Sequence, residues 1–196
     1  MLPRVSDDEE SLRPARPADA RDYASHIVRH LRDSGKNGEP HYAPIWGVER
    51  DDVAQACERR WSAPVGEPGW GRAWLLHRTV NFGLLPGSSS NVVGHVELRG
   101  PTIPASQHRA ELSVGLEAPF RARGLGARLV TAAIAWARAE TALSHIDLKV
   151  FAHNQRARKL YTRLGFVEIG KLTEAFVMPD GTVIDDVLMV LRIPRA

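Results

Sequence analysis

A strand, a glycine-rich turn and a helix follow one another between Glu111 and Glu140, and this succession constrains the fold more than any other feature of the sequence. The strand reads E-L-S-V-G-L-E, the turn contains R-A-R-G-L-G, and the helix continues as A-R-L-V-T-A-A-I-A-W-A-R-A-E. A helix begins with unpaired backbone N–H groups and the positive end of its dipole, and glycine lets a ligand approach that backbone closely. The turn is therefore predicted to bind a phosphate or pyrophosphate group.

A second strand, at residues 145–151, follows this helix and completes a β-α-β unit. The two strands are expected to be parallel and joined by a right-handed crossover. Periodicity and turn residues predict the other elements. Strands are expected at residues 12–16, 74–80, 92–99, 109–117, 166–177 and 182–193, and helices at residues 17–35, 50–61, 124–140 and 154–164. The fold class is thus α/β (α+β), with one mixed sheet of about six or seven strands flanked by about four helices.

Two of these elements carry predictions about which side chains share a face. Strict alternation in residues 92–99 puts one set on the first face (Val93, His95, Glu97 and Arg99) and another set on the second (Val92, Val96 and Leu98). The helix at residues 17–35 repeats apolar side chains at helical spacing, namely Tyr23, Ile27, Val28 and Leu31. Residues 81–91 are expected to form a turn or loop. Residues 1–12 are expected to be a flexible tail and residues 13–196 a single domain.

Composition bounds the class of protein. Hydrophobic residues make up 43% of the 196 residues, which is typical of a globular chain. No apolar run is long enough for a membrane helix and the N-terminus lacks the apolar core of a signal peptide, so a soluble, cytoplasmic protein is expected. Cys57 is the single cysteine, which excludes an internal disulfide and a cysteine-based zinc site, and no metal is predicted.

Two motifs in a fixed order resemble the GNAT N-acetyltransferases, which transfer an acetyl group from acetyl-CoA to an amine. The first is R-A-R-G-L-G at Arg121–Gly126, which fits the family signature Q/R-x-x-G-x-G/A and lies between the expected fourth strand and the next helix. The second is N-Q-R-A-R-K-L-Y-T-R-L-G-F at Asn154–Phe166, which fits N-x-x-A-x-x-L-Y-x-x-L-G-F. The resemblance covers residues 92–193, about half of the chain.

The resemblance implies acetyl-CoA as co-substrate and a sheet whose fourth and fifth strands splay apart. The pyrophosphate would bind the signature turn, the pantetheine arm would pair with the fourth strand, and a helix-capping asparagine would contact the same arm. The matching positions here are Val114, Gly115, Leu116, Arg121, Arg123, Gly124, Leu125, Gly126, Ala127 and Asn154. Basic residues near the two motifs are available for a phosphorylated cofactor, namely Arg121, Arg123, Arg128, Arg156, Arg158, Lys159 and Arg163.

Two catalytic roles follow from the same resemblance. Tyr161 matches the tyrosine that protonates the departing thiolate. The amine must also lose a proton, because a typical alkyl ammonium has a pKa near 10. Glu111 is the first candidate for the base, and Glu97, His95 or a water chain are the alternatives. Asp185 and Asp186 are weaker candidates for orienting a cationic acceptor.

The acceptor itself is left open by the sequence. The resemblance allows a small amine, a polyamine, an amino acid or a protein N-terminus. Residues 36–48 form an expected loop whose large side chains either cover the core or wall an acceptor pocket, namely His41, Tyr42, Ile45 and Trp46. Dimerisation is common in the family, but the sequence carries no sign of a homodimer.

Two other classes of function are weighed against the enzyme. One is a non-catalytic CoA-binding sensor or interaction module on the same fold. The other is a nucleotide- or nucleic-acid-binding protein. The net charge of +3 is mild and the glycine turn lacks the G-x-x-x-x-G-K-[ST] pattern, so no nucleic-acid partner is expected.

Overall fold

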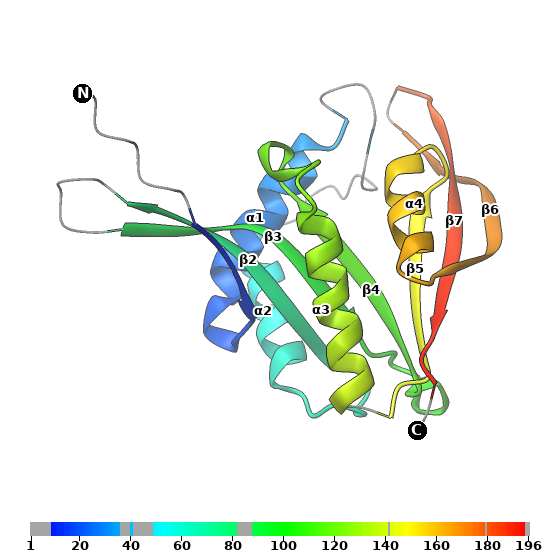
Figure 1. Cartoon of the computed structure of the whole chain (residues 1–196), viewed down its shortest axis with the longest axis horizontal. Coiled ribbons are helices and arrows are strands. Elements are labelled where there is room, and N and C mark those ends of the chain that lie inside the picture. The colour runs from blue at the N-terminus through cyan, green and yellow to red at the C-terminus, as the bar shows by residue number, and fades with distance from the viewer. Residues whose placement is uncertain are drawn as a thin grey trace.

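The computed structural model describes residues 9–35, 40, 49–81, 88–140, 142–178 and 180–194, whose strands form one sheet with helices on both faces (Figure 1). The strands are β1 (Glu9–Pro14), β2 (Gly71–Asn81), β3 (Ser88–Arg99), β4 (Arg109–Leu116), β5 (His145–Phe151), β6 (Val167–Val177) and β7 (Val183–Arg192). The α-helices are α1 (Ala20–Asp33), α2 (Arg50–Ser62), α3 (Leu125–Glu140) and α4 (Gln155–Arg163), and short 3-10 turns lie at Pro17–Asp19, Pro104–Ser106 and Ala118–Phe120.

The seven strands run in the order β1-β2-β3-β4-β5-β7-β6. Only β4 and β5 pair in parallel, and every other neighbouring pair is antiparallel. The parallel pair is joined through α3, as a β-α-β crossover requires. The prediction of a mixed sheet with six or seven strands and four helices is therefore confirmed.

The pairing of β4 with β5 is short. Three residue pairs join the two strands, and the last is Glu111 with Asp147. Beyond that pair the strands diverge, so residues 112–116 of β4 and 148–151 of β5 border a gap in the sheet (Figure 1). The predicted splay is thus present, and residues 112–116 of β4 have no pairing partner on β5.

The two faces of the sheet carry separate cores. On one face α3 packs on the strands through Leu129, Val130 and Ala133, which are buried with Val96 and Leu98 of β3. On the other face, α1 and α2 form a second cluster with β2 and β3, made up of Ala20, Tyr23, Ala24, Ala54, Cys57, Trp61, Ala73, Leu75 and Val92. The two apolar faces fix the sheet between helix layers and leave the splay as the opening between α3 and α4.

A β-bulge corrects the predicted faces of β3. The register moves from Leu76 paired with Gly94 to His77 paired with Val92, so Val93 is an extra residue in the strand. An extra residue reverses the alternation on one side of it. Val93 therefore joins the α3 core and Val92 joins the α1–α2 core, the opposite of the prediction from strict alternation.

The buried face of α1 also differs from the prediction. Tyr23 is buried as expected, but the next fully buried large side chains on the helix are His26 and His30, at spacings of three and four, whereas Ile27 and Leu31 are only partly buried. Apolar periodicity does not indicate these histidines, because imidazole is polar. Their burial depends on partners from β3 and β4, which α1 alone does not reveal.

Two expected irregular segments belong to strands. β1 begins at Glu9, so the prediction of a flexible tail is wrong for residues 9–12, and residues 1–8 lie outside the described residues. β3 begins at Ser88, so the predicted loop is wrong for residues 88–91. In both places the partner β2 supplies backbone hydrogen bonds that offset a polar composition of low strand propensity.

Candidate active site

The signature turn has the backbone geometry of an anion site. The N–H of Arg128 donates the first helical hydrogen bond of α3 to the carbonyl of Gly124 at 3.2 Å. The N–H groups of Leu125, Gly126 and Ala127 precede it and have no carbonyl within the helix to pair with. Gly124 and Ala122 have φ values of +78° and +68°. A left-handed alanine is strained, and such strain is frequent in ligand-binding segments.

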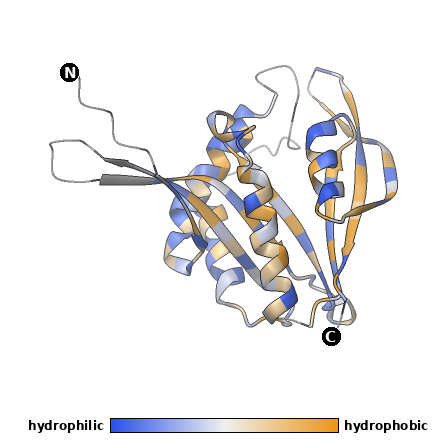
Figure 2. Cartoon of the chain, in the orientation of Figure 1, coloured by the Kyte–Doolittle hydropathy of each residue, from blue (hydrophilic) through white to orange (hydrophobic). Residues whose placement is uncertain are grey.

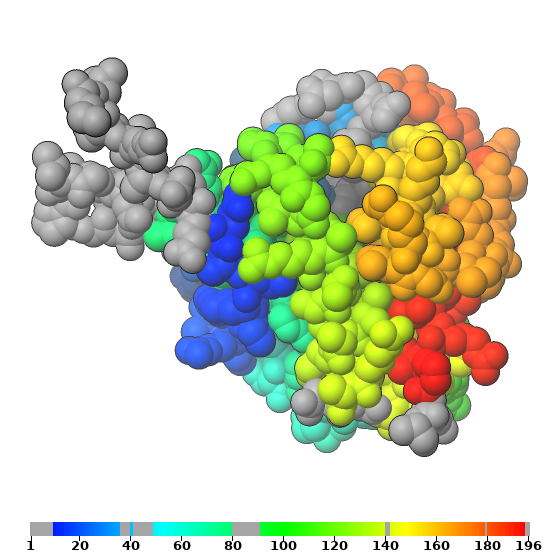
Figure 3. Space-filling model, viewed as in Figure 1, coloured from blue at the N-terminus to red at the C-terminus, as the bar shows by residue number. Residues whose placement is uncertain are grey.

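Gly126 faces the gap between three elements. A Cβ at this residue would lie 3.5 Å from Leu160 of α4 and 3.6 Å from Leu116 of β4. The space-filling view shows a hollow between the N-terminal part of α3 and α4 (Figure 3). The absence of a side chain at Gly126 therefore keeps open the space where the pantetheine arm of CoA is expected to enter.

Arg121 is prepared for an anion at the same opening. Its Nε donates to the carbonyl of Leu116 at 2.9 Å, while its buried Nη2 has no hydrogen-bond partner among the described residues. Burial lowers the pKa of Arg121; the nearby carboxylate of Asp33 opposes this shift, and the positive charge of Arg156 adds to it. A phosphate between these two guanidinium groups would relieve their repulsion and pair the Nη2, so the residues present fit a CoA pyrophosphate.

Arg123 belongs to the predicted site through its backbone only. Its guanidinium pairs with Glu10 of β1 at 2.7 Å and lies over the ring of Phe120, with 5.8 Å to the ring centroid. Arg128 also donates to the carbonyl of Glu10, at 3.4 Å. Both side chains therefore tie α3 to β1 and point away from the splay.

The second motif forms α4 as expected. The side chain of Asn154 caps the helix by accepting from the N–H of Ala157 at 3.1 Å, and Gly165 ends it with a φ of +95°. Tyr161 is buried beside Phe166, with 5.8 Å between ring centroids, and burial raises the pKa of its hydroxyl. The hydroxyl is therefore protonated at neutral pH and competent to donate.

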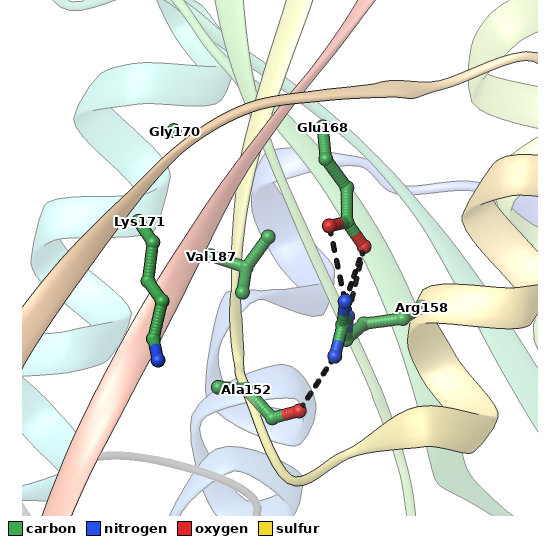
Figure 4. Close-up of a pocket in the computed structure, with 6 residues that line it drawn as sticks. All are labelled: Ala152, Arg158, Glu168, Gly170, Lys171 and Val187. Atoms are coloured by element: carbon green, nitrogen blue, oxygen red, sulfur yellow. Dashed lines mark hydrogen bonds and ion pairs between the residues drawn. The ribbon is translucent and has the colours of Figure 1, made fainter.

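Hydrophilic residues cover much of the outer surface of α4 (Figure 2). Arg156, Lys159 and Arg163 are exposed on this helix, whereas Arg158 is engaged in a small pocket of about 340 Å³ between α4 and the β6–β7 hairpin (Figure 4). Arg158 donates to both carboxylate oxygens of Glu168, at 2.8 and 3.0 Å, and to the carbonyl of Ala152 at 2.9 Å. Arg158 thus has its partners within the pocket, while Lys171, which also lines it, pairs with Asp185 of β7 at 2.6 Å. Arg158 therefore connects α4 to β6.

Glu111 lies at the point where the parallel strands separate. It is exposed, and it pairs with Arg99 of β3 at 3.3 Å. It lines a groove of about 640 Å³ together with Asp147 and Lys149 of β5. Gly115 lies four positions after Glu111, which is about 13 Å along an extended strand. The structure thus brings Glu111 to this groove and not to residues 114–116, the segment of β4 that is expected to hold the pantetheine arm and its thioester.

His95, a weaker candidate base, lies opposite that segment. It pairs in register with Gly115, and a Cβ on Gly115 would lie 2.6 Å from Cε1 of His95 and 2.9 Å from Nε2 of His30. The two imidazoles therefore fill the space that a side chain at Gly115 would need. His26, His30 and Glu117 complete this cluster, and none of them belongs to the two sequence motifs. The one available signal was two histidines four residues apart on a helix.

Glu97, the other alternative base, is occupied by structural contacts. Its carboxylate accepts from the indole N–H of Trp61 at 2.9 Å and from the hydroxyl of Tyr23 at 3.3 Å, and it pairs with Arg60 at 3.2 Å. Cys57 lies in the same region, and burial raises the pKa of its thiol to about 12, which makes it unreactive at neutral pH. This region holds α2 against the sheet.

The two aspartates of β7 differ in what they contact. Asp185 pairs with Lys171 at 2.6 Å and accepts from the N–H of Glu174 at 2.8 Å, and these contacts lower its pKa. Asp186 is buried, and its Oδ1 has no hydrogen-bond partner within the described ranges. Burial raises the pKa of Asp186, although Lys149 opposes the shift. Asp186 is therefore the carboxylate with unused hydrogen-bonding capacity.

Parts of the predicted site cannot be placed. His41, Tyr42, Ile45 and Trp46 lie outside the described residues. In the part of the chain that is described, no group of three His, Cys, Asp or Glu side chains is arranged to hold a metal ion. None of the helices in the described segments combines the length and apolar composition that spanning a bilayer requires.

The sequence pattern described as the Acetyltransferase (GNAT) family matches residues 50–166. This chain belongs to the GNAT family. The motifs at Arg121–Gly126 and Asn154–Phe166, which carried the resemblance, both lie inside the matched region, so that prediction is confirmed. Membership in this family places the chain among the acyltransferases and explains the splay beside the signature turn.

Known proteins similar to the chain are named as acetyltransferases. The chain is 33% identical over 81 residues to the uncharacterized N-acetyltransferase YycN of Bacillus subtilis (strain 168), and the matched region is 41% of this chain. The match spans 51% of YycN, about half the length of that relative. A GNAT acetyltransferase from Streptococcus pneumoniae has a similar structure, with a TM-score of 0.75, 22% identity and coverage of 94% of this chain and 100% of its own. The structure of the putative acetyltransferase yncA from Salmonella typhimurium, solved with acetyl-CoA, is also similar. Its TM-score is 0.72 at 18% identity, and the match covers 96% of this chain and 96% of yncA.

Proposed function

We propose that this protein is an N-acetyltransferase that moves an acetyl group from acetyl-CoA to a primary amine by direct attack in a ternary complex. One observation carries the proposal: the unpartnered Nη2 of Arg121 and the bare Cα of Gly126 both belong to residues that contact Leu116, where β4 ends beside the splay, and Gly126 also faces α4, the helix that carries the buried Tyr161. An anion site, a slot without a side chain and a protonated phenol are what this reaction needs.

The roles of the site residues follow from their positions. The N–H groups at residues 123–127 and the guanidinium of Arg121 would hold the pyrophosphate. Residues 114–116 would pair with the pantetheine arm, and Asn154 would contact it while still capping α4. Acetyl-CoA supplies the activated acetyl group. All described strands share one sheet, which supports residues 13–196 as a single catalytic domain.

The acceptor is proposed only as a class. A ribosomal-protein-alanine N-acetyltransferase from Brucella melitensis and a spermidine N-acetyltransferase chimera from Vibrio cholerae and hSSAT share the fold, at 22% and 21% identity. Their names indicate different amines, so the fold does not select one. Glu111 in the groove and the buried Asp186 are the carboxylates proposed to attract an ammonium group. A cytoplasmic location, where acetyl-CoA is available, fits this role.

The proposed function is tested by thiol release with acetyl-CoA and a panel of amines that contains spermidine, free amino acids and peptides with an unblocked N-terminus. We expect release of CoA that depends on one class of amine, and a higher melting temperature with acetyl-CoA. A melting temperature that acetyl-CoA leaves unchanged would contradict the proposal. Tight binding without turnover over the whole panel would instead support a CoA-binding sensor.

Tyr161→Phe is expected to lower kcat about 10- to 100-fold, because the departing thiolate loses its proton donor. Acetyl-CoA affinity should change little, since the ring and its packing on Phe166 are kept. Tyr23→Phe is the matched control, as that buried hydroxyl contacts Glu97 at 3.3 Å. Steady-state kinetics with the best panel amine measure both variants. Equal kcat values for Tyr161→Phe and the wild type would remove Tyr161 from the reaction.

Glu111→Gln is expected to raise the KM for a cationic acceptor about 3- to 10-fold with kcat within about threefold, because one charge pair at a solvated groove contributes about 1 kcal/mol. Glu58→Gln, an exposed change on α2, should leave both constants unchanged. If kcat instead falls tenfold or more and rises steeply with pH, Glu111 is the base, as the sequence resemblance suggested.

A further inference from the structure

Three hydrogen-bonded ionisable side chains connect the residue after β4, through α1, to β3, namely Glu117, His26 and His95. Nδ1 of His26 lies 3.0 Å from Oε1 of Glu117, and Nε2 of His26 lies 3.0 Å from Nδ1 of His95. His26 has no exposed surface and His95 is 1% exposed, whereas the side chain of Glu117 is 17% exposed and also accepts from Arg29 at 2.9 Å. These three hydrogen-bonded side chains thus connect the interior of the protein to solvent.

The hydrogen bonds fix which ring nitrogens carry protons. An ionised carboxylate only accepts, so Glu117 requires the proton of His26 to be on Nδ1. The Nε2 of a neutral His26 is then an acceptor, which requires the proton of His95 to be on Nδ1 as well. Nε2 of His95 is left with a lone pair, and no hydrogen bond among the described residues uses it.

This lone pair lies beside residues 114–116, the segment of β4 that is expected to hold the pantetheine arm and its thioester. His95 is paired in register with Gly115, and its Cε1, the atom next to Nε2, occupies the place of a side chain at Gly115. His30 flanks the same glycine and stacks on His26, with 5.8 Å between ring centroids. The imidazoles lie on the α1–α2 face of the sheet, the face on which Glu111 and Arg99 border the groove.

We propose that His95, His26 and Glu117 form a proton relay that takes the proton from the acceptor amine and delivers it to solvent at the end of β4. The proposal rests on the proposed acetyl transfer and adds the route of the proton. His95 is the catalytic residue of the relay because it meets the amine, directly or through one water. His26 and Glu117 act through His95.

The protons balance along this route. The ammonium gives one proton to Nε2 of His95, the Nδ1 proton of His95 passes to Nε2 of His26, and the Nδ1 proton of His26 passes to Glu117 and then to solvent. The freed lone pair attacks the thioester carbonyl, and the carbon–sulfur bond breaks. The second proton lost by the nitrogen matches the one gained by the thiolate, so each turnover releases one proton overall.

The surroundings favour neutral imidazoles. Burial lowers the pKa of His95 well below 6.5, and the neighbouring His26, His30 and Arg99 lower it further. Burial also lowers the pKa of His26, which Glu117 partly offsets. The other charged or titratable groups around these three side chains are Arg29 and Tyr23 on α1, and Glu97 on β3 with its partner Arg60 on α2. A neutral His95 is available as an acceptor at neutral pH.

The ground state of the relay is tested without turnover. In two-bond 1H–15N NMR spectra of the full chain labelled with 15N-histidine, we expect His26 and His95 as Nδ1–H tautomers at pH 7. Glu117→Gln, whose amide can also donate, should weaken this preference in both rings. An Nε2–H tautomer at either histidine in the wild-type protein would overturn the relay.

The kinetic test uses His26→Gln, which keeps a polar side chain but cannot pass a proton along. We expect kcat with the best panel amine to fall about 10- to 100-fold, with unchanged acetyl-CoA affinity. Wild-type kcat should be flat above about pH 6.5, because the lowered pKa keeps His95 neutral there. In the variant, kcat should rise about tenfold per pH unit toward the amine pKa near 10.

Two further variants separate proton transfer from a structural effect. His77 is a buried histidine of β2 that does not belong to the relay, so His77→Gln should keep the wild-type pH profile. His95→Ala should regain at least tenfold in rate with added imidazole, in proportion to its neutral fraction. The relay is overturned if the wild type transfers acetyl groups and His26→Gln keeps both the wild-type kcat and the flat pH profile. That outcome leaves the proposed function standing. Failure of acetyl-CoA to bind the wild type overturns the function itself.

Discussion

Gly126→Leu is expected to weaken acetyl-CoA binding more than 100-fold, equivalent to about 2.7 kcal/mol. The Cβ position of Gly126 lies 3.5–3.6 Å from Leu160 and Leu116, so a Cβ by itself fits. The remaining atoms of a leucine would extend into the space between α3, α4 and β4. Titration calorimetry with acetyl-CoA measures the loss, and the melting temperature of the unliganded protein reports whether the fold is kept.

A series at the same residue shows whether the loss comes from blocking the slot. Gly126→Ala adds only the Cβ, so we expect a loss of about tenfold or less with the fold intact. Gly170→Leu introduces the same side chain on the exposed face of β6, where a Cβ lies 3.8 Å from Leu188, and should leave binding unchanged. Wild-type affinity in Gly126→Leu would place the cofactor outside the splay.

Glu97→Ala is expected to lower the free energy of unfolding by about 3 kcal/mol. The carboxylate is 1% exposed, so its removal leaves the indole N–H of Trp61 without its acceptor and the charge of Arg60 without its partner. Breaking a buried pair costs about 3–5 kcal/mol, and the lower end applies because the Arg60 side chain is 27% exposed. Urea denaturation measures the change.

Glu168→Ala is the matched control for this prediction. It also removes a carboxylate from an arginine, but the Arg158–Glu168 pair lies at the surface, where the Glu168 side chain is 40% exposed. A surface pair contributes about 0–1 kcal/mol, so the two losses should differ by at least about 2 kcal/mol. Equal losses would show that Glu97 is not a structural anchor of α2, and its candidacy as a base would return.

The local rules of the chain predicted most of the secondary structure and the cofactor side of the site. The motif at Asn154–Phe166 contains its own helix cap, Asn154, and its own helix end, Gly165. Both residues act as predicted. The boundaries of β5 agree residue for residue. Predictions that needed a partner strand were less successful. The bulge at Val93 and the strand residues 9–12 and 88–91 depend on pairing with β2, which the segments do not encode by themselves.

The sequence by itself determined the order of strands and helices and the phosphate-binding turn, because spacing, capping and glycine act within a few residues of the chain. Only the tertiary structure decided how the acceptor side is built. It tied Glu97 to Trp61 and Arg60, left Glu111 in a groove with Arg99, and connected His95 to Glu117 through His26. Except for the Glu111–Arg99 pair, whose residues are nearer in sequence, those contacts join residues that are 36 to 91 positions from each other. Burial, hydrogen-bond direction and tautomer are properties of such packed groups, so no local pattern records them.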